Sequence, residues 1–421
     1  MKHNFASKVL KNVQVQQEKF KGTSRWLNKA IKFNQDLQLT TKQKQSLHPI
    51  FEDLQISSRK ENIFNFEVLM ANFLEHRDDL RPIAISLDKN TWKKDKYNKV
   101  GYSVIKIIGE LEKRGYVQVK KGFQTEQDSR LTRIWPGEKL LDYLRILPGG
   151  VIYEPVQLVE LRDRKTKKLK DYRDTERTCK IRNMLEKANK INGKADIRFQ
   201  AWELKTFLKA IFIEKFTWYG RLHTRGYRHY QGLTKVERSE ITINGEPIIE
   251  LDFKGLHPHL FYAKEGLQCP DDPYSIINID PDVRPFLKHI LLCMVNAKDE
   301  VQAERAANYW LKFHPREYRK LLSKNITGAK PLMKSFLEVH EPISRYFCNG
   351  KENGLKVMNL DATIALNIVN CFAKKRIPIL AIHDSFIVQE KHEKELYQVM
   401  KNSYKKFAGN FDIGITVQNR N

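Results

Sequence analysis

A carboxylate near the end of an apolar strand is the first side chain in this sequence whose type and position suit chemistry. Within residues 240–253, Asn244-Gly245 is a strong signal for a two-residue type I′ hairpin turn. Apolar residues alternate after the turn, so Glu250 and Asp252 should point to the face opposite to the apolar side chains. Taken alone, such a carboxylate is best explained as an edge or capping residue of the strand.

A second carboxylate, Asp384, stands between two apolar runs of strand length, 377–382 and 386–388. The pattern predicts a strand, a turn and a second strand, with His383 and Asp384 at the bend. Burying two carboxylates without partners would be costly, and shared divalent cations would satisfy both. Two carboxylates that hold a pair of Mg²⁺ or Mn²⁺ ions are what in-line phosphoryl or nucleotidyl transfer needs. Asp252 and Asp384 are therefore candidate catalytic residues and metal ligands.

Basic residues recur along a predicted helix over residues 281–297. Arg284, Lys288 and Asn296 are separated by multiples of four residues, so they follow one face of that helix. Arginine and lysine one turn apart can bind successive phosphates of a triphosphate. Without the other motifs, the same pattern is an ordinary amphipathic helix with exposed basic residues.

The composition favours a nucleic-acid partner. The chain has 421 residues, 75 of them Lys or Arg against 50 Asp or Glu, and its net charge of +25 points to a polyanion. An acidic membrane surface or a basic proteome would explain the charge as well. No apolar run approaches the roughly 18 residues of a membrane span, and the N-terminus lacks a secretory signal. The five cysteines form no C-x-x-C pair, so we expect reduced thiols and a soluble, cytoplasmic protein of two or three domains.

The segment 81–137 resembles winged-helix DNA-binding domains. Helical spacing over 104–111 ends at Gly115, and strands are predicted at 116–119 and 131–135 with a basic loop between them. A small α/β packing module without a ligand explains the order equally well. The basic residues of the predicted wing are Lys120, Lys121, Arg130 and Arg133.

Four motifs occur in the order used by the A-family palm polymerases, and the chain resembles that superfamily over about residues 200–390. This superfamily includes bacterial DNA polymerase I-type enzymes and single-subunit RNA polymerases. The motifs are Thr217-x-x-Gly220-Arg221, LDFKGLHPHLFYA (251–263), Arg284-x-x-x-Lys288 and AIHDSFIV (381–388), and LDATIALNIVNCFAKK (360–375) resembles the helix that precedes the last motif.

The resemblance implies a role for each matched residue. Asp252 and Asp384 would hold two Mg²⁺ ions, or Mn²⁺, with the backbone carbonyl of Phe253 as a further ligand. The incoming nucleotide would be held by Arg284, Lys288, Asn296 and His257. The template and primer would be contacted by Arg221 and His383, and the basic residues that follow, Arg225, Arg228, Lys235 and Arg238, would track the same backbone.

The sequence also departs from the family pattern. His257 stands five residues after Asp252, where the DNA polymerases place a Glu that helps to exclude a ribose 2′-OH, and Asn296 stands where Tyr is usual. Relaxed selection between dNTPs and rNTPs is therefore a hypothesis. Arg284 follows Asp252 by only 32 positions, so we expect small fingers. Residues 1–200 show no carboxylate-rich nuclease pattern, so we expect no proofreading.

The expected fold is α+β: a right-hand polymerase with a palm on an antiparallel sheet and reduced helical fingers, after an N-terminal helical, winged-helix-like domain. The expected domains are 1–155, a basic linker and thumb-like helix over 156–200, and a palm and fingers core over 201–421. We expect a DNA polymerase or primase of a mobile element, acting on DNA template, primer and nucleoside triphosphates, with a helicase or small accessory replication protein as further partner and no membrane. The alternatives are a single-subunit DNA-directed RNA polymerase and a non-catalytic winged-helix replication initiator with a degenerate palm.

Overall fold

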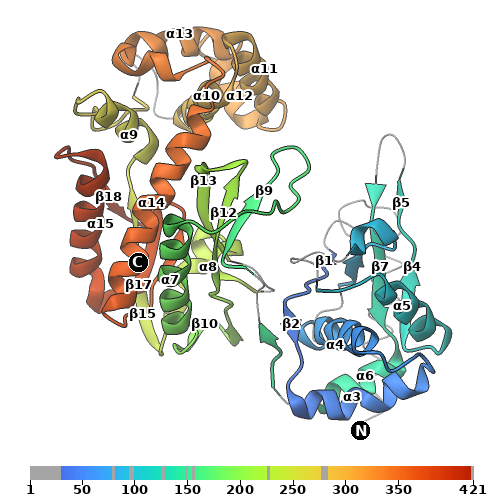
Figure 1. Cartoon of the computed structure of the whole chain (residues 1–421). Coiled ribbons are helices and arrows are strands. Elements are labelled where there is room, and N and C mark those ends of the chain that lie inside the picture. The colour runs from blue at the N-terminus through green and yellow to red at the C-terminus, as the bar shows by residue number, and fades with distance from the viewer. Residues whose placement is uncertain are drawn as a thin grey trace. The chain divides into compact units, whose positions relative to one another are not determined.

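The computed structural model describes residues 30–77, 81–93, 99–124, 129–147, 149–153, 157–224, 228–275 and 283–418. The chain divides into two compact units, Met1–Gln157 and Leu158–Asn421, and each unit has its own hydrophobic core (Figure 1). Both units combine helices with sheets, so the organisation is mixed α and β. Among the described residues, no helix combines the length and the apolar character needed to cross a lipid bilayer.

The first unit is built on a sheet with strands in the order β1-β3-β7-β4. β7 pairs antiparallel with β3 and β4, whereas β1 pairs parallel with β3. The strands are β1 (Ile31–Lys32), β2 (Leu37–Gln38), β3 (Ile83–Ile85), β4 (Val117–Lys120), β5 (Phe123–Gln124), β6 (Ser129–Arg130), β7 (Thr132–Pro136) and β8 (Ile152–Tyr153). The helices are α3 (Thr41–Asp53), α4 (Lys60–Glu75), η1 (Lys89–Trp92), α5 (Ser103–Lys113) and α6 (Glu138–Ile146).

The predicted order of helix, strand, loop and strand is present in this unit. The apolar stripe of α5 is buried, and the helix stops at Gly115, whose φ of 77° is a backbone conformation that favours glycine. β4 then pairs with β7, and the short β5–β6 ladder lies between them in the chain. Lys120 and Lys121 are exposed, and the guanidinium of Arg130 lies 5.6 Å from the ring centre of Phe123. The assignment as a winged helix stays a prediction.

The second unit contains two sheets. The first has the order β11-β10-β14-β15-β17-β16, and β18 also pairs with β15; every pairing in it is antiparallel. The second has the order β13-β12-β9. The strands are β9 (Val159–Arg162), β10 (Ile197–Phe199), β11 (Trp202–Glu203), β12 (Leu208–Ile213), β13 (Lys215–Thr224), β14 (Ile241–Ile243), β15 (Glu246–Phe253), β16 (Leu380–Ile382), β17 (Ser385–Gln389) and β18 (Ile415–Val417).

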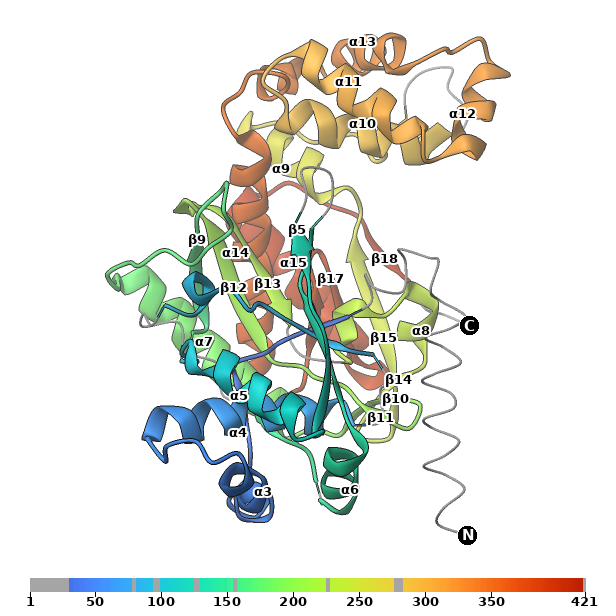
Figure 2. The same ribbon diagram turned by 90° about the vertical axis from the view of Figure 1, so that its right-hand side faces the viewer.

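A long helix, α14 (Asn353–Lys374), connects the sheets with a helical lobe made of α10–α13 (Figures 1 and 2). It packs against β13 and α7, and apolar residues occur on most of its sides because it is buried between neighbours. The other helices are α7 (Glu176–Asn192), η2 (Tyr230–Gly232), α8 (Lys235–Ser239), α9 (Leu256–Lys264), α10 (Arg284–Asn296), α11 (Glu300–Leu311), α12 (Pro315–Leu322), α13 (Ala329–Val339), η4 (Glu341–Tyr346), η5 (Glu390–His392) and α15 (Glu393–Ala408).

Local sequence signals account for the elements that carry the candidate motifs. Asn244 and Gly245 have φ of 53° and 77°, as a type I′ turn requires, and they join β14 to β15 as predicted. The helices predicted over 281–297 and 360–375 are present as α10 and α14. Residues 158–200 belong to the second unit: β9 pairs with β12, and α7 packs against α14. The thumb-like role of this segment stays a prediction.

Candidate active site

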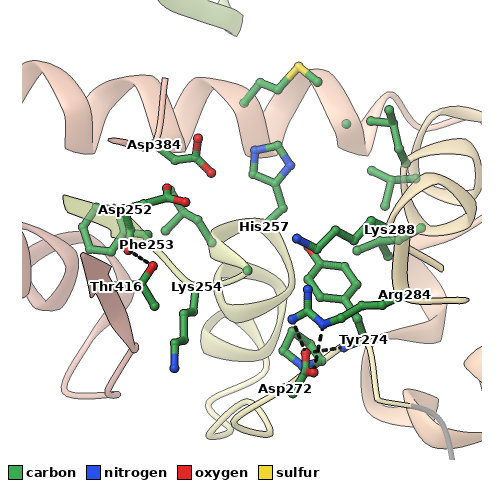
Figure 3. A pocket seen from close by; sticks show the side chains of 18 of the residues that line it. Asp252, Phe253, Lys254, His257, Asp272, Tyr274, Arg284, Lys288, Asp384 and Thr416 are labelled. Atoms are coloured by element: carbon green, nitrogen blue, oxygen red, sulfur yellow. Dashed lines mark hydrogen bonds and ion pairs between the residues drawn. The ribbon is translucent and has the colours of Figure 1, made fainter. Parts of the chain in front are cut away.

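Asp252 and Asp384 come from two adjacent antiparallel strands. β15 and β17 are paired so that Asp252 lies opposite Ser385, and the Phe253 amide donates to the Asp384 carbonyl at 3.3 Å. Figure 3 shows the two carboxylates pointing toward one another at one end of a pocket. The predicted strand, turn and strand around Asp384 is confirmed, with β16 and β17 joined by His383 and Asp384.

His383 occupies a strained position in that turn. Its φ is 57°, at a place in a two-residue hairpin where glycine is preferred. Its Nδ1 is buried and has no hydrogen-bond partner in the described part of the chain, and burial, followed by the charge of Arg221, lowers its pKa. Its ring lies 5.7 Å from the ring of His223 on β13. Strained residues persist where the surrounding structure fixes them, and they concentrate at functional sites.

In the part of the chain that the structure describes, the carboxylates of Asp252 and Asp384 lack a cationic partner. Burial, reinforced by Asp384 and Glu250, raises the pKa of Asp252 to about 7, and burial also raises the pKa of Asp384. Within the described residues, the side-chain donor to Asp252 is the Gln418 amide, which donates to Oδ2 at 3.1 Å. Over the described ranges, neither aspartate forms an ion pair. The two groups therefore repel one another in a setting that disfavours their charges.

This arrangement fits divalent cations. The available donors are two facing carboxylates and the backbone carbonyl of Phe253, which are the hard oxygen ligands that Mg²⁺ prefers. No cluster of three or more His, Cys, Asp or Glu side chains suited to a metal occurs within the described residues. Mg²⁺ sites in phosphoryl-transfer enzymes commonly use one or two carboxylates plus substrate phosphates, so two are sufficient.

A pocket of about 550 Å³ opens in front of the carboxylates, and its far side is basic. Arg284 and Lys288 on α10 line that side, opposite Asp252 and Asp384 (Figure 3). The pocket thus holds two carboxylates at one end and two cations at the other, which is the distribution that a metal-bound triphosphate would match. Its remaining lining includes His257, Asn296, Met358 and Thr416.

The two cations are held in place by a turn before α10. Asp272 accepts two hydrogen bonds from Arg284, at 2.7 and 3.1 Å. The ring centre of Tyr274 lies 5.1 Å from the Arg284 guanidinium and 5.4 Å from the Lys288 ammonium. Burial, followed by the charge of Arg284, lowers the pKa of Lys288. An anion placed between the two cations would remove that repulsion.

Asn296 lies at the C-terminal end of α10, beside the start of α14. A Cβ added to Gly354 would come within 2.1 Å of the Asn296 Oδ1, so glycine is required for this close approach. The Asn296 amide donates to the Leu292 carbonyl at 2.8 Å. Both Asn296 and Gly354 line the pocket, so this contact fixes one of its walls.

Arg221 and His257 share a buried carboxylate that sequence reasoning did not single out. Arg221 donates twice to Asp361 Oδ2, at 3.1 and 2.7 Å, and the His257 Nε2 lies 3.3 Å from the same oxygen. Burial alone would raise the pKa of Asp361, but the hydrogen bond with His257 and the charge of Arg221 outweigh it and lower the pKa. The guanidinium of Arg221 is thereby engaged within the protein, and its contact with template or primer stays a prediction.

The glycine of the Thr217–Arg221 motif serves packing. Tyr219 and Gly220 have φ of 64° and 83°, where β13 departs from regular register with β12. A Cβ on Gly220 would lie 2.7 Å from the Phe212 ring and 2.9 Å from the Asn359 amide. The atoms that leave no room for a side chain at position 220 thus belong to the protein itself, at the contact between β13 and α14.

The other predicted nucleic-acid residues have varied surroundings. Arg225 lies outside the described residues. The Arg228 guanidinium lies 4.3 Å from the Trp202 ring centre. Arg238, expected to follow the template–primer backbone, instead donates two hydrogen bonds to buried Glu250, at 2.8 and 3.0 Å.

Three residues that shape the site had weak signals in the sequence. Asp361 is a lone carboxylate within an apolar helix, which is itself an indication of a buried partner. Asp272 and Tyr274 belong to the Pro- and Asp-rich stretch Cys269–Tyr274, which is readily interpreted as a turn alone. Their contacts with Arg284 depend on how this turn packs against α10, and local pattern does not specify that packing.

Comparisons with known proteins give a remote structural likeness and no match in sequence. No protein-family profile matches the sequence, and no curated protein matches it. Among solved structures, it is similar to the POL domain of Pol1 from M. smegmatis, in a complex with DNA primer-template and dNTP, with a TM-score of 0.35 and 10% identity. The match covers 91% of this chain, and the chain spans 66% of the length of that domain.

Proposed function

We propose that the second unit is a template-directed nucleotidyltransferase of the A-family palm type, a DNA polymerase or primase. The observation that carries the proposal is the pair Asp252 and Asp384: two carboxylates without a cationic partner in the described chain, with raised pKa values, facing a pocket with Arg284 and Lys288 on its opposite side. The order of the motifs supports the same reading.

The charged residues at the two ends of the pocket, and the polar residues between them, have distinct roles in this proposal. Asp252, Asp384 and the Phe253 carbonyl would hold two divalent cations, which when bound would activate an attacking 3′-hydroxyl and neutralise the leaving pyrophosphate. Arg284 and Lys288 bind and orient the triphosphate, and the Asp272 carboxylate keeps the Arg284 fork aligned. His257 and Asn296 line the space available to the sugar, so they are the candidates for controlling the choice between dNTP and rNTP. A role in copying a mobile element remains part of the proposal.

The decisive test is extension of a labelled primer on a single-stranded template with Mg²⁺ or Mn²⁺ and either dNTPs or rNTPs. Synthesis should require the metal and should fall at least about 10³-fold in Asp252→Ala and Asp384→Ala, because several kcal/mol of charge stabilisation depend on these ligands. Glu246→Ala is the matched control, since it removes a half-exposed carboxylate, paired with Lys391, from the same strand, β15.

The same gel separates the alternatives. Products made from rNTPs on a promoter duplex would favour a single-subunit RNA polymerase. Products made without a primer on single-stranded template would favour a primase. DNA binding without any metal-dependent synthesis, or near-normal synthesis in either aspartate variant, would refute the proposed function and leave a non-catalytic initiator.

A further inference from the structure

Two large aromatic side chains are exposed together on the helical lobe. Tyr309 and Phe313 are 59% and 66% exposed, and their ring centres lie 5.1 Å apart in an edge-on arrangement at the end of α11. A contact between residues four apart adds little to the stability of a helix. Such an aromatic pair at the surface is therefore more informative than a single exposed apolar residue.

Cations flank this pair in the sequence. Between Arg305 and Lys330 the chain has seven Lys or Arg residues and one acidic residue, Glu317. Arg305 lies one helical turn before Tyr309, and Arg316 is the second residue of the next helix, α12. The Lys312 ammonium lies 5.7 Å from the Tyr309 ring centre. In the described ranges, none of these three cations forms an ion pair with a carboxylate. Their charges are therefore available to a ligand.

The corner that carries the pair is rigid. Trp310 stacks on His314 with ring centres 3.5 Å apart, and His314 Nδ1 donates to the Trp310 carbonyl at 2.8 Å. Trp310 also stacks against Phe286 and His289 of α10, with ring centres 5.6 and 5.1 Å apart. A ligand that binds Tyr309 and Phe313 would thus meet a preorganised surface.

The surface is separate from the nucleotide pocket. Within the lobe, the pocket is lined by residues of α10, and none of its lining residues comes from α11 or α12. In Figures 1 and 2, α10 is the helix of the lobe nearest the sheets, and α11 lies beyond it. Tyr309 and Phe313 therefore lie outside the lining of the pocket that holds Asp252.

We infer that Tyr309 and Phe313, with Arg305, Lys312 and Arg316, form a binding surface for single-stranded nucleic acid. Unpaired bases stack on exposed aromatic rings, and the phosphates between them meet interspersed cations; this combination is what sequence-independent single-strand sites use. A membrane-binding helix would instead segregate its cations from a continuous apolar face. On this surface the cations and the aromatic rings alternate.

The test is equilibrium binding of a labelled oligodeoxythymidine of about twelve nucleotides, within the usual site size, to the full chain in EDTA. Tyr309→Ala and Phe313→Ala should each weaken binding by about 5- to 100-fold, as loss of a stacking platform does, without changing the salt dependence. Phe313→Trp should retain affinity. Arg305→Gln and Arg316→Gln should each reduce the slope of log affinity against log salt by about 0.7, because each removes one phosphate contact.

Matched controls come from the same unit. Tyr397→Ala removes an exposed aromatic from α15, and Lys334→Gln removes an exposed cation from α13; neither should have a comparable effect. Unchanged affinity in both aromatic-to-alanine variants would overturn the inference, even if the arginine variants alter the slope. Loss of binding to phosphatidylserine vesicles in these variants, with oligonucleotide binding intact, would likewise overturn it in favour of a membrane surface.

Primer extension on a template with a single-nucleotide overhang keeps this inference distinct from the proposed function. Extension that persists while the oligonucleotide signature is absent would overturn the surface and leave the polymerase proposal standing. The expected oligonucleotide signature without any extension would support the surface and count against the polymerase proposal.

Discussion

Four carboxylates in the second unit follow one another as electrostatic neighbours, in the order Glu250, Asp252, Asp384 and Asp361. By their environments they fall into two pairs. Glu250 and Asp361 are almost fully buried, and each accepts hydrogen bonds from an arginine, Arg238 or Arg221. Asp252 and Asp384 lie at the edge of the pocket and have no such partner in the described chain.

This difference in pairing distinguishes carboxylates that stabilise the fold from carboxylates that are available to bind a ligand. A buried carboxylate that is matched by an arginine is neutralised within the protein, and removing one partner leaves the other charge exposed to a low dielectric. Two facing carboxylates without a cation destabilise the metal-free protein instead. A protein retains such a pair where function requires it, and this is a hypothesis that stability measurements can examine.

The largest stability effect should follow removal of a matched carboxylate. Asp361→Asn should lower the free energy of unfolding by about 3–5 kcal/mol, because the Arg221 guanidinium then stays buried without a counter-charge. Urea denaturation of the full chain measures this change. Asp196→Asn, which breaks an exposed pair with Arg198, is the control and should cost about 1 kcal/mol or less. A small effect of Asp361→Asn would mean that the two carboxylate pairs do not differ as argued.

Removing an unmatched carboxylate should have the opposite sign. The pKa of Asp252 is raised from 3.8 to about 7, so the native state binds more protons than the unfolded state between these values, and stability should fall as the pH rises from about 4 to about 7. In EDTA at pH 8, Asp252→Asn should therefore raise the free energy of unfolding by about 1–2 kcal/mol, discounted for the partial exposure of the group. A loss of stability would place Asp252 among the structural carboxylates.

The pKa of Asp361 is lowered in the native state, so its pH dependence should run the other way. Its contribution is present above the unfolded pKa and is lost as the pH falls through the native value. The stability difference between wild type and Asp361→Asn should accordingly shrink in acid. A difference that grows in acid would contradict the paired state of Asp361.

The contrast between the paired and the unpaired carboxylates could be predicted only in part from the sequence. The alternation along β15 correctly predicted that Glu250 and Asp252 lie on one face of the strand. It did not predict that Glu250 is paired with an arginine whereas Asp252 faces the pocket. Glu250 has a structural role because Arg238, on α8, forms an ion pair with it. Asp252 has no such partner in the described chain because it lines the pocket. Helix cover and pocket position are tertiary features that strand periodicity does not encode.

The same limit applies to Arg221. Its motif suggested a phosphate contact, whereas its nearest acidic partner, Asp361, lies 140 residues later in the chain. Such a pairing depends on how β13 packs against α14, and the Gly220 contact with Asn359 is part of that packing. Short-range signals were sufficient for the Asn244-Gly245 hairpin and for the extent of α10, where the determinants are local.

Metal binding should add stability only where both unmatched carboxylates are present. At ten times the dissociation constant, Mg²⁺ should raise the free energy of unfolding of the wild-type protein by about 1.4 kcal/mol, because a ligand that binds only the native state shifts the equilibrium by mass action. Thermal melts with and without Mg²⁺ measure this shift. Asp252→Asn and Asp384→Asn should lose it, and Glu246→Ala should keep it. Equal shifts in all four proteins would mean that Mg²⁺ binds elsewhere.

The smallest effect should come from an ion pair that belongs to neither class, the half-exposed contact between Asp272 and Arg284. Breaking it should change stability by less than about 1 kcal/mol, because solvent already screens the pair. Asp272→Asn should instead raise the KM for the nucleotide by about 5- to 10-fold with kcat nearly unchanged, since the freed Arg284 fork loses orientation for ground and transition states alike. Glu300→Gln, which removes an exposed carboxylate from the start of α11 outside the pocket lining, is the control. A fall in kcat at constant KM would show that Arg284 acts chiefly in the transition state. Arg284 on α10 would then count among the catalytic charges, together with Asp252 and Asp384.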